Sequence, residues 1–516
     1  MKDDTITNII EVSSTKRIAK NTLMLYFRQI LIMLVSLYTV RVVLNVLGTE
    51  DYGIYNVVAG VVTMFSILSG AMASATQRFF SFELGTGDKE KLEKIFSVTL
   101  LIYVALALLI ILLAETVGLW FVCNKLVIPR ERFTAAIWIY QFSILSFAVT
   151  MITAPYLSTV IAHECMDIYA YVSIIEVVLK LVIVFLLKII PMDKLVIYGL
   201  LMFTVTFLNT AIYRLICKKK FNECKFHLQW DGKMIKEITS YVGWNLFGNA
   251  VSVFNNQIMN IVLNQCFGLV VNAARAISSQ VNSAVNSFAQ NFSTATKPQI
   301  IKTYAANQKE ECHLLVFQSC KITFFLMWVL TLPLVSEMQF VLKVWLKNVP
   351  DYAVFFAQLT LIEALINSVS YPIMTLAQAT GKIKLYQGVV GGILLCNLPF
   401  ACILLKLGCN PYSVMYSQII VAIIATIARL VICNHLSRFS VLDFSIKVLI
   451  PLVLVVISSS VLPYFICKKL TISIVRFFIN GFVCVIGVCS SMWLLGLNKN
   501  EKALLAEIIR KKIGRG

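Results

Sequence analysis

Several patterns that carry chemistry in other proteins are missing from this sequence. The 14 cysteines form no CxxC pair, and no ligand spacing links the four histidines, His163, His227, His313 and His435. We therefore expect no disulfide framework, no metal site and no cofactor. No nucleophile–base set, phosphate-binding loop or carboxylate pair stands out either, so the sequence offers no catalytic residue and we expect no enzyme.

Charge is also scarce. Charged residues make up 14% of the chain against 59% hydrophobic residues, and the mean hydropathy is +0.82. No soluble globular protein needs that balance, so we predict an all-α polytopic membrane protein. The net charge of +19 does not indicate nucleic-acid binding, because the Lys and Arg residues lie mostly in short loops and at the termini, where they can also attract anionic membrane lipids. The polar first 20 residues predict no signal peptide.

Apolar segments long enough to cross a bilayer recur along the whole chain, and they predict about 14 transmembrane helices. The connections between them are too short to hold an extramembrane catalytic domain. The predicted spans are Thr22–Leu47, Tyr52–Phe80, Ile95–Trp120, Phe133–Ile161, Ile168–Ile190, Leu195–Cys217, Ile238–Gln265, Leu269–Lys297, Leu314–Val335, Tyr352–Ala379, Leu385–Leu407, Tyr412–Cys433, Phe444–Cys467 and Ile472–Leu495.

The distribution of Lys and Arg predicts the orientation of these spans. The basic segments before the first span, after the second, sixth and tenth spans, and at the end of the chain all fall on one side. By the positive-inside rule that side is the cytoplasm, so we expect both termini there. Two loops run against the rule: one holds Lys125, Arg130 and Arg132, and the other holds Lys468 and Lys469.

An internal repeat relates the two halves of the chain. Gly48 aligns with Gly268 and Pro155 with Pro372, and the spacing between the halves changes by only a few residues. Six helices per half predict two lobes of the same orientation, related by a pseudo-two-fold axis along the membrane normal, with a binding site between them. The predicted organisation is a cytoplasmic segment 1–20, an N-lobe 21–217, a basic cytoplasmic linker 218–237, a C-lobe 238–434, two further helices in 435–497 and a basic cytoplasmic tail 498–516.

Polar residues on the seventh and eighth predicted helices follow steps of three or four, so each set shares one helix face. The two sets are Asn245, Asn249, Ser252, Asn256, Asn260 and Asn264, and Arg275, Ser279, Asn282, Asn286, Gln290, Ser293 and Lys297. Against lipid such a stripe is costly, so it should face a bundle interior or a cavity. Polar contacts between tightly packed helices are the alternative. We favour a cavity because the eighth helix's stripe is long and has a cation at each end.

The first half has its own version of the striped pair, in helices one and two. The candidate substrate-binding residues are therefore Arg41, Asn45, Gln77, Arg78, Asn249, Asn256, Asn260, Arg275, Asn282, Asn286, Gln290 and Lys297. Helices one, two, seven and eight offer no Asp or Glu in their cores, so Arg41 and Arg275 need water, amide oxygens or an anionic ligand. The alternative is that these two arginines extend toward the membrane surface. Arg78 and Lys297 are equally well explained as interface anchors. Glu363, in the tenth helix, has no obvious partner.

The stretch Asn21–Gly87, with "RVVLNVLGTEDYGIYNVVAG" and "SATQRFFSFELG", resembles the bacterial lipid-linked polysaccharide flippases. These O-antigen and capsule repeat-unit exporters share a superfamily with the lipid II flippase and the multidrug and toxin extrusion proteins. The resemblance implies two six-helix lobes around a cationic cavity, in the bacterial cytoplasmic membrane. It also implies alternating access to an undecaprenyl-pyrophosphate-linked oligosaccharide. Arg41 and Arg275 match the cationic cavity, and helices 13 and 14 could form a groove for the lipid tail.

Two other functions are weighed against this one. A drug/cation antiporter of the same superfamily needs an acidic residue in its cavity, and helices one and seven lack one. A membrane glycan polymerase or ligase needs a large outer loop with a catalytic acid or base, which the short loops do not provide. The implied partners are thus a lipid-linked anionic glycan and membrane lipids, with a polysaccharide polymerase as a further partner that the resemblance allows.

Overall fold

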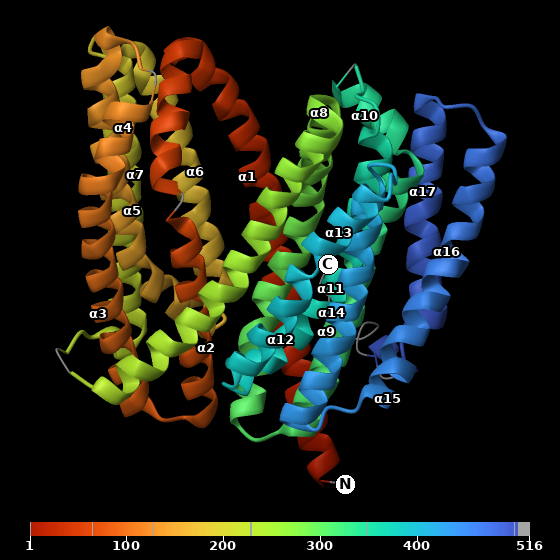
Figure 1. Ribbon diagram of the computed structural model, residues 1–516. Helices are drawn as coiled ribbons and strands as arrows, with labels where there is room; N and C mark the ends of the chain where they lie inside the picture. Colours follow the sequence, from red (N-terminus) through yellow and green to blue (C-terminus); the bar gives the residue numbers. More distant parts are fainter. Residues whose placement is uncertain are drawn as a thin grey trace, which may run out of the picture. The chain divides into compact units, whose positions relative to one another are not determined.

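The structure of the protein is a computed structural model (Figure 1). Helices form every regular element in its described part. The structure describes residues 2–63, 65–126, 128–227, 230–346, 348–499 and 501–503. The side chains of residues 2–16, 37, 40, 41, 44, 49, 63, 67 and 269 are outside this description. The described chain divides into two compact units, which we call the N-unit (21–246) and the C-unit (1–20 with 247–516).

The N-unit contains most of α1 and the elements that follow it. They are α1 (Lys2–Thr63), α2 (Ser66–Thr86), α3 (Lys89–Leu113), a π-helical turn η1 (Ala114–Gly118), α4 (Leu119–Lys125), a 3₁₀ turn η2 (Arg130–Arg132), α5 (Phe133–Ala162), α6 (Met166–Ile189), α7 (Lys194–Lys220) and a 3₁₀ turn η3 (Asn222–Cys224). The boundary with the C-unit falls inside α8 (Gly232–Ala305), between Leu246 and Phe247.

The C-unit contains the rest of α8 and the remaining helices. They are α9 (Lys309–Ser336), α10 (Met338–Leu346), α11 (Ala353–Ala379), α12 (Ile383–Leu395), α13 (Asn397–Lys406), α14 (Ser413–Ser437), α15 (Val441–Phe444), a π-helical turn η4 (Ser445–Leu449), α16 (Ile450–Lys469), α17 (Ile474–Ser491) and a π-helical turn η5 (Met492–Gly496). A continuous apolar core runs between α8, α9, α11 and α14.

The prediction of an all-α, multi-pass membrane protein is confirmed. Among the described residues, ten helices are long and apolar enough to cross a membrane, and they include both predicted C-terminal spans, 444–467 and 472–495. Four of the fourteen predicted spans are not among the ten, although the structure is helical there too. Three of these four, 52–80, 238–265 and 269–297, are spans with polar stripes.

Glycine turns the chain at matching places in the two units. Gly48 interrupts α1 with φ 83°, and Gly268 interrupts α8 with φ 77°. An L-residue with a Cβ avoids this left-handed conformation, and glycine adopts it without strain. The aligned glycines therefore end one span and begin the next within a single residue. This shared device supports the sequence repeat at the level of backbone conformation.

Arg132, one of the cations that run against the predicted orientation, is held in a three-way ion pair in the N-unit. Its Nε donates to Asp51 Oδ1 at 2.8 Å, and its Nη1 contacts Asp193 Oδ2 at 2.6 Å. Burial acts to raise the pKa of Asp193, but hydrogen bonds from Arg132 and the Val196 backbone N–H bring that pKa below its ordinary value. Because both carboxylates offset its charge, Arg132 joins α5 to the turn of α1 and to the start of α7.

Polar contacts at three places hold α16, α17 and the residues that follow them against α9 and Glu337 in the C-unit. At one end, Glu337, which is 1% exposed, accepts hydrogen bonds from Arg476 Nη2 at 2.7 Å and from Asn480 Nδ2 at 3.0 Å. Trp328 Nε1 donates to Ser459 Oγ at 2.9 Å farther along α9. Beyond it, Lys321 Nζ meets Glu501 Oε2 at 2.6 Å. We call this set of contacts the α9 clasp.

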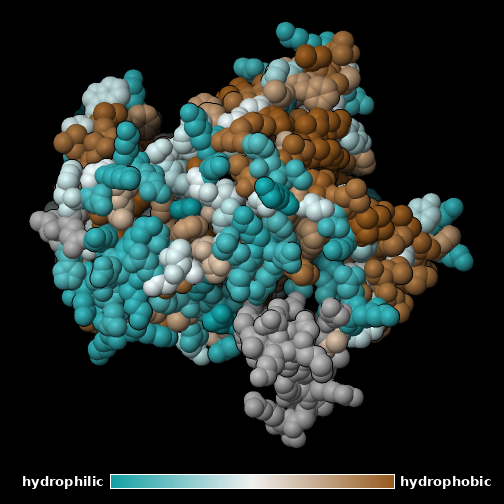
Figure 2. All heavy atoms as spheres, turned by 90° about the horizontal axis from the view of Figure 1, so that it is seen from below, coloured by the Kyte–Doolittle hydropathy of each residue, from teal (hydrophilic) through white to brown (hydrophobic). Residues whose placement is uncertain are grey.

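The outward faces of α16 and α17 are strongly apolar, as a surface against lipid requires. Val453, Ile457, Phe478 and Phe482 are all more than half exposed. Figure 2 shows hydrophobic atoms over the side of the protein where α16 and α17 lie, and hydrophilic atoms over helix ends. The two helices are thus attached to α9 through polar contacts and present apolar side chains elsewhere.

Breaking the α9 clasp at Glu337 should destabilise the protein. Replacement Arg476→Ala leaves a buried carboxylate without its cation, which costs about 3–5 kcal/mol. We expect a clear fall in the thermal unfolding midpoint of the purified protein. The control is Asp443→Asn, since Asp443 and Lys447 form a pair at 4.0 Å in which both side chains are about half exposed. Equal midpoints for the two variants would contradict the assignment.

Candidate functional site

The polar residues predicted to share one face of the seventh and eighth helices lie on α8, and we call them the α8 stripe. Arg275 is a deeply buried cation of this stripe. Its side chain is 5% exposed, and its Nη1 has no hydrogen-bond partner among the described residues. The position follows from the chain, because Arg275 lies seven residues after Gly268, about 10 Å along the helix from the turn. A buried guanidinium stays charged and retains the capacity to donate to an acceptor.

The charge that acts on Arg275 comes from another helix, α11. Glu363 interacts electrostatically with Arg275, and its Oε1 accepts a hydrogen bond from Asn367 Nδ2 at 3.3 Å. No ion pair within 4.0 Å joins Arg275 to a described carboxylate. The sequence indicated no obvious partner for Glu363; in the structure its hydrogen-bond partner is Asn367 on the same helix and its counter-charge is Arg275 on α8.

A hydrogen bond fixes the register between α8 and α11. Tyr371 OH donates to Asn286 Oδ1 at 3.0 Å. Arg275 lies eleven residues before Asn286 and Glu363 lies eight residues before Tyr371 on helices that run in the same direction, so the two charges differ in level by about one helical turn. Asn282, one turn before Asn286, is half-buried, and its Oδ1 has no described hydrogen-bond partner. Arg275, Asn282 and Asn286 therefore face the same side of the unit's interior as Glu363.

A second buried arginine in the C-unit has hydrogen-bond partners on two other helices. Arg429 on α14 donates through Nε to Tyr386 OH and through Nη1 to Ser370 Oγ, both at 3.1 Å. Ser370 Oγ lies 3.0 Å from Thr426 Oγ1. This network ties α11, α12 and α14 together beside Tyr371. Its acceptors are neutral hydroxyls, so Arg429 adds positive charge to the region without an adjacent carboxylate.

The remaining predicted residues of the α8 stripe are less buried. Asn249, Asn256 and Gln290 are exposed, and Asn256 Nδ2 donates to the Ser252 carbonyl of its own helix at 3.1 Å. Asn260 and Lys297 are half-buried. The stripe thus continues as an accessible polar face on both sides of the turn. On this stripe, Asn286 and Gln290 each form a side-chain hydrogen bond with Tyr371 of α11, and Arg275 interacts electrostatically with Glu363 of the same helix.

The predicted residues of the N-unit take different roles. The guanidinium of Arg78 lies 4.6 Å from the Phe82 ring centre and 5.7 Å from that of Tyr241, which gives it a cation–π environment. Gln77 is half-buried with Nε2 unpartnered among described residues, and Asn45 is exposed. The side chain of Arg41 lies outside the described residues. Aromatic packing therefore accounts for the burial of Arg78 without a ligand.

Sequence reasoning singled out Glu363 without linking it to Arg275, and it missed Tyr371 and Arg429 as members of this region. Arg429 carried a usable signal, because a charged residue within an apolar span is rare and marks a polar interior. Tyr371 carried none, since a tyrosine in a span is common. Within the described chain, no group of His, Cys, Asp and Glu is arranged to hold a metal ion.

The arrangement favours one kind of chemistry. A buried cation with free donor capacity, flanked by amide groups and opposed by a carboxylate it does not touch, can bind an anion by hydrogen bonding and charge. The described residues around it include no nucleophile paired with a base.

Comparison with known proteins supplies the family and the fold. The model of a family described as polysaccharide biosynthesis protein matches residues 18–304. A MATE transporter crystallised in a bent conformation is similar to the chain with a TM-score of 0.71 and 13% identity, over 83% of this chain and 96% of that one. A Pyrococcus furiosus transporter of the MOP superfamily, described as having a binding pocket of reverse polarity, gives a TM-score of 0.64 and 14% identity, over 82% of this chain and 96% of that one.

A mutant of a Vibrio cholerae MATE transporter gives a TM-score of 0.62 and 16% identity, over 84% of this chain and 99% of that one. The comparison with curated proteins found no match. At these identities the structures show a shared transporter fold. The family model covers more than half of the sequence. The chain therefore belongs to the polysaccharide biosynthesis protein family and has the two-lobed, all-helical fold of MOP-superfamily transporters.

Proposed function

We propose that this protein is a flippase that moves an undecaprenyl-pyrophosphate-linked oligosaccharide from the cytoplasmic to the outer leaflet of the bacterial cytoplasmic membrane by alternating access. The observation that carries the proposal is Arg275, a buried guanidinium with an unpartnered Nη1. Pyrophosphate offers the oxygens that such a group prefers, and it is the fixed part of every substrate in this class. The membership in a polysaccharide family supports the glycan part of the substrate.

Competition from the carboxylate of Glu363 favours release of the ligand from this site. With the site empty, Glu363 partly offsets the charge of Arg275. When phosphate binds, it competes with Glu363 for the same cation, and the bound state is favoured only while its hydrogen bonds outweigh that competition. A ligand whose affinity differs between two conformations can drive the exchange between them. Arg41 is proposed as a second phosphate-binding cation from the sequence argument.

A drug/cation antiporter of the same fold is the runner-up. Such a transporter needs a carboxylate available to a cation. In the described part of the α8 stripe, the carboxylate that faces it is already opposed by Arg275, and Arg429 adds a further positive charge nearby. The electrostatic balance of the C-unit interior therefore favours an anion over a cation.

The transport proposal predicts a defined cellular defect. Deleting the gene should lower surface polysaccharide and cause lipid-linked repeat units to accumulate on the cytoplasmic side, measured by lipid extraction and mass spectrometry. Drug susceptibility should not change. Normal export without accumulation, in a strain that has no second flippase, would show that the protein does not carry this substrate.

The role of Arg275 is tested by two substitutions. Arg275→Ala should lower export at least about tenfold, because a charge-assisted hydrogen bond contributes about 1.5–3 kcal/mol. Arg275→Lys should restore part of it, since the charge remains and the two-pronged geometry is lost. Export is measured as surface polysaccharide per unit of protein in the membrane. Lys406→Ala, an exposed cation at the end of α13, is the matched control and should export normally.

Glu363 should lower the affinity for the same ligand whose affinity Arg275 raises. Glu363→Gln removes the charge that competes with phosphate, so the purified protein should bind undecaprenyl pyrophosphate more tightly than the wild type while exporting glycan more slowly. Binding is measured by titration in detergent, with Glu115→Gln as control. Glu115 lies in the N-unit with Gln141 Nε2 at 3.1 Å from its Oε2. Weaker binding to the Glu363 variant would mean that this carboxylate supports the ligand.

A further inference from the structure

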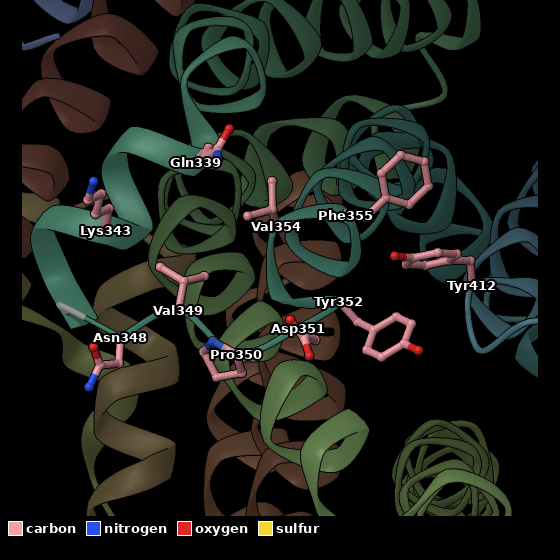
Figure 3. Close-up of a pocket in the computed structure, with 10 residues that line it drawn as sticks. All are labelled: Gln339, Lys343, Asn348, Val349, Pro350, Asp351, Tyr352, Val354, Phe355 and Tyr412. Atoms are coloured by element: carbon pink, nitrogen blue, oxygen red, sulfur yellow. The ribbon is translucent and has the colours of Figure 1, made fainter. Parts of the chain in front are cut away.

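A second concave feature of the C-unit is separate from the buried charges. A pocket of about 590 Å³ opens where α9 leads through α10 into α11 (Figure 3). It lies at the end of α11 opposite to Lys382 and Lys384, which follow that helix. Its volume is within the range of about 300 to 1,000 Å³ that small-molecule sites occupy.

Three aromatic rings form one side of this pocket. The ring centres of Tyr352 and Tyr412 lie 5.4 Å apart, and those of Phe355 and Tyr412 lie 4.7 Å apart. The rings are accessible, since Tyr352 is 37% and Phe355 is 40% exposed. Figure 3 shows these three rings together at one end of the lining, with Lys343 and Asn348 at the other and Asp351 between.

The backbone holds Tyr352 in a conformation that tyrosine disfavours. The Ala353 N–H donates to the Pro350 carbonyl at 3.2 Å, which closes a turn with Tyr352 at its third position. Tyr352 has φ 71° and ψ −19°, the values of a type II turn, where glycine is the usual residue. A side chain there costs about 1–2 kcal/mol. Strain of this kind is retained where the side chain serves a purpose, and this one delivers a ring to the pocket.

The polar part of the lining is electrically balanced. Lys343 and Asp351 carry opposite charges, and Asn348 contributes an amide. A phosphate or another simple anion gains little from such a pair, and a lipid chain would leave these groups without partners. A neutral molecule with many hydroxyl groups and apolar C–H faces matches both halves of the lining, because hydroxyls bond to the polar groups and C–H faces pack on the rings.

The distance between the pocket and the buried charges is similar to the length of a short oligosaccharide. Glu363, which faces Arg275, lies ten residues into α11 from Ala353, or about 15 Å along the helix. A short chain of sugar rings attached to a pyrophosphate at Arg275 would span this distance. The pocket and the charged site therefore lie in one unit at the two ends of a substrate-sized interval.

We propose that this pocket binds sugar units of the transported oligosaccharide, with Tyr352, Phe355 and Tyr412 as the stacking surface. The inference rests on the proposed function and extends it, because it assigns the glycan a site of its own apart from the pyrophosphate. The pocket contacts sugar, and the Arg275 region contacts phosphate. Specificity for the glycan then depends on the turn between α10 and α11.

Binding of a phosphate-free probe tests the pocket alone. The probe is the free repeat-unit oligosaccharide released from the host's own surface polysaccharide, and contact with the full-length protein in detergent is measured by saturation-transfer NMR and titration. Tyr352→Gly should weaken binding about fivefold, because the ring is lost while the turn becomes unstrained. Tyr352→Phe should keep the binding. Tyr412→Leu should weaken it, and Tyr416→Leu, one turn along α14 and exposed, is the matched control.

The outcomes separate this inference from the proposed function. Since glycine fits the turn, Tyr352→Gly should unfold at the same temperature as the wild type or higher, so a loss of binding cannot reflect misfolding. Arg275→Ala should bind the free oligosaccharide normally and fail to export. Unchanged binding in both Tyr352→Gly and Tyr412→Leu, or no binding by the wild type, overturns the sugar site and leaves the flippase proposal intact. Normal export by Arg275→Ala would instead count against the proposed function.

Discussion

A charge withdrawn from water needs a partner, and this requirement organises the described structure. Arg132 has two carboxylates, Arg476 has Glu337, and Lys321 has Glu501. Each of these pairs joins segments that are far apart in the sequence, so neutralising the charge also fixes one helix to another. Arg275 differs from these three cations, because its described counter-charge acts on it without forming a contact pair. Its Nη1 is buried without a described hydrogen-bond partner, so it retains the capacity to donate to a ligand.

The same requirement distinguishes the α9 clasp, where the charges are paired, from the Arg275 region, where polar atoms lack described partners. In the α9 clasp, Glu337 receives hydrogen bonds from both Arg476 and Asn480, so its charge is fully used. Around Arg275, Asn282 and Arg275 each have a buried polar atom without a described partner. A ligand that pairs with these atoms stabilises whichever conformation allows the contact. The need of buried charges for partners therefore explains both regions. It attaches α16 and α17 to α9, and it leaves polar atoms of α8 open to a ligand.

Hydropathy and repetition are properties of whole segments, and for that reason much of the fold was predictable from the sequence. The all-helical class, ten of the fourteen predicted spans and the alignment of Gly48 with Gly268 need no knowledge of tertiary contacts. The site was harder, because it depends on which faces meet. The pattern on α8 identified Arg275, but only the contact between Tyr371 and Asn286 brings α11 and its Glu363 into register with it. The strained turn at Tyr352 gave no sequence signal, since nothing local requires a positive φ there.

The glycine turns at Gly48 and Gly268 have a mechanical consequence. Most consecutive spans are connected by several residues that can absorb a displacement, but in α1 and α8 the connection is one residue wide. The two arms of each pair therefore meet at a single glycine, the residue whose backbone is least restricted. The polar stripe of α8 lies on both sides of this joint, with Asn256 and Asn260 before Gly268 and Arg275 after it. A change of φ or ψ at Gly268 alone would change the angle between these two sets of polar side chains.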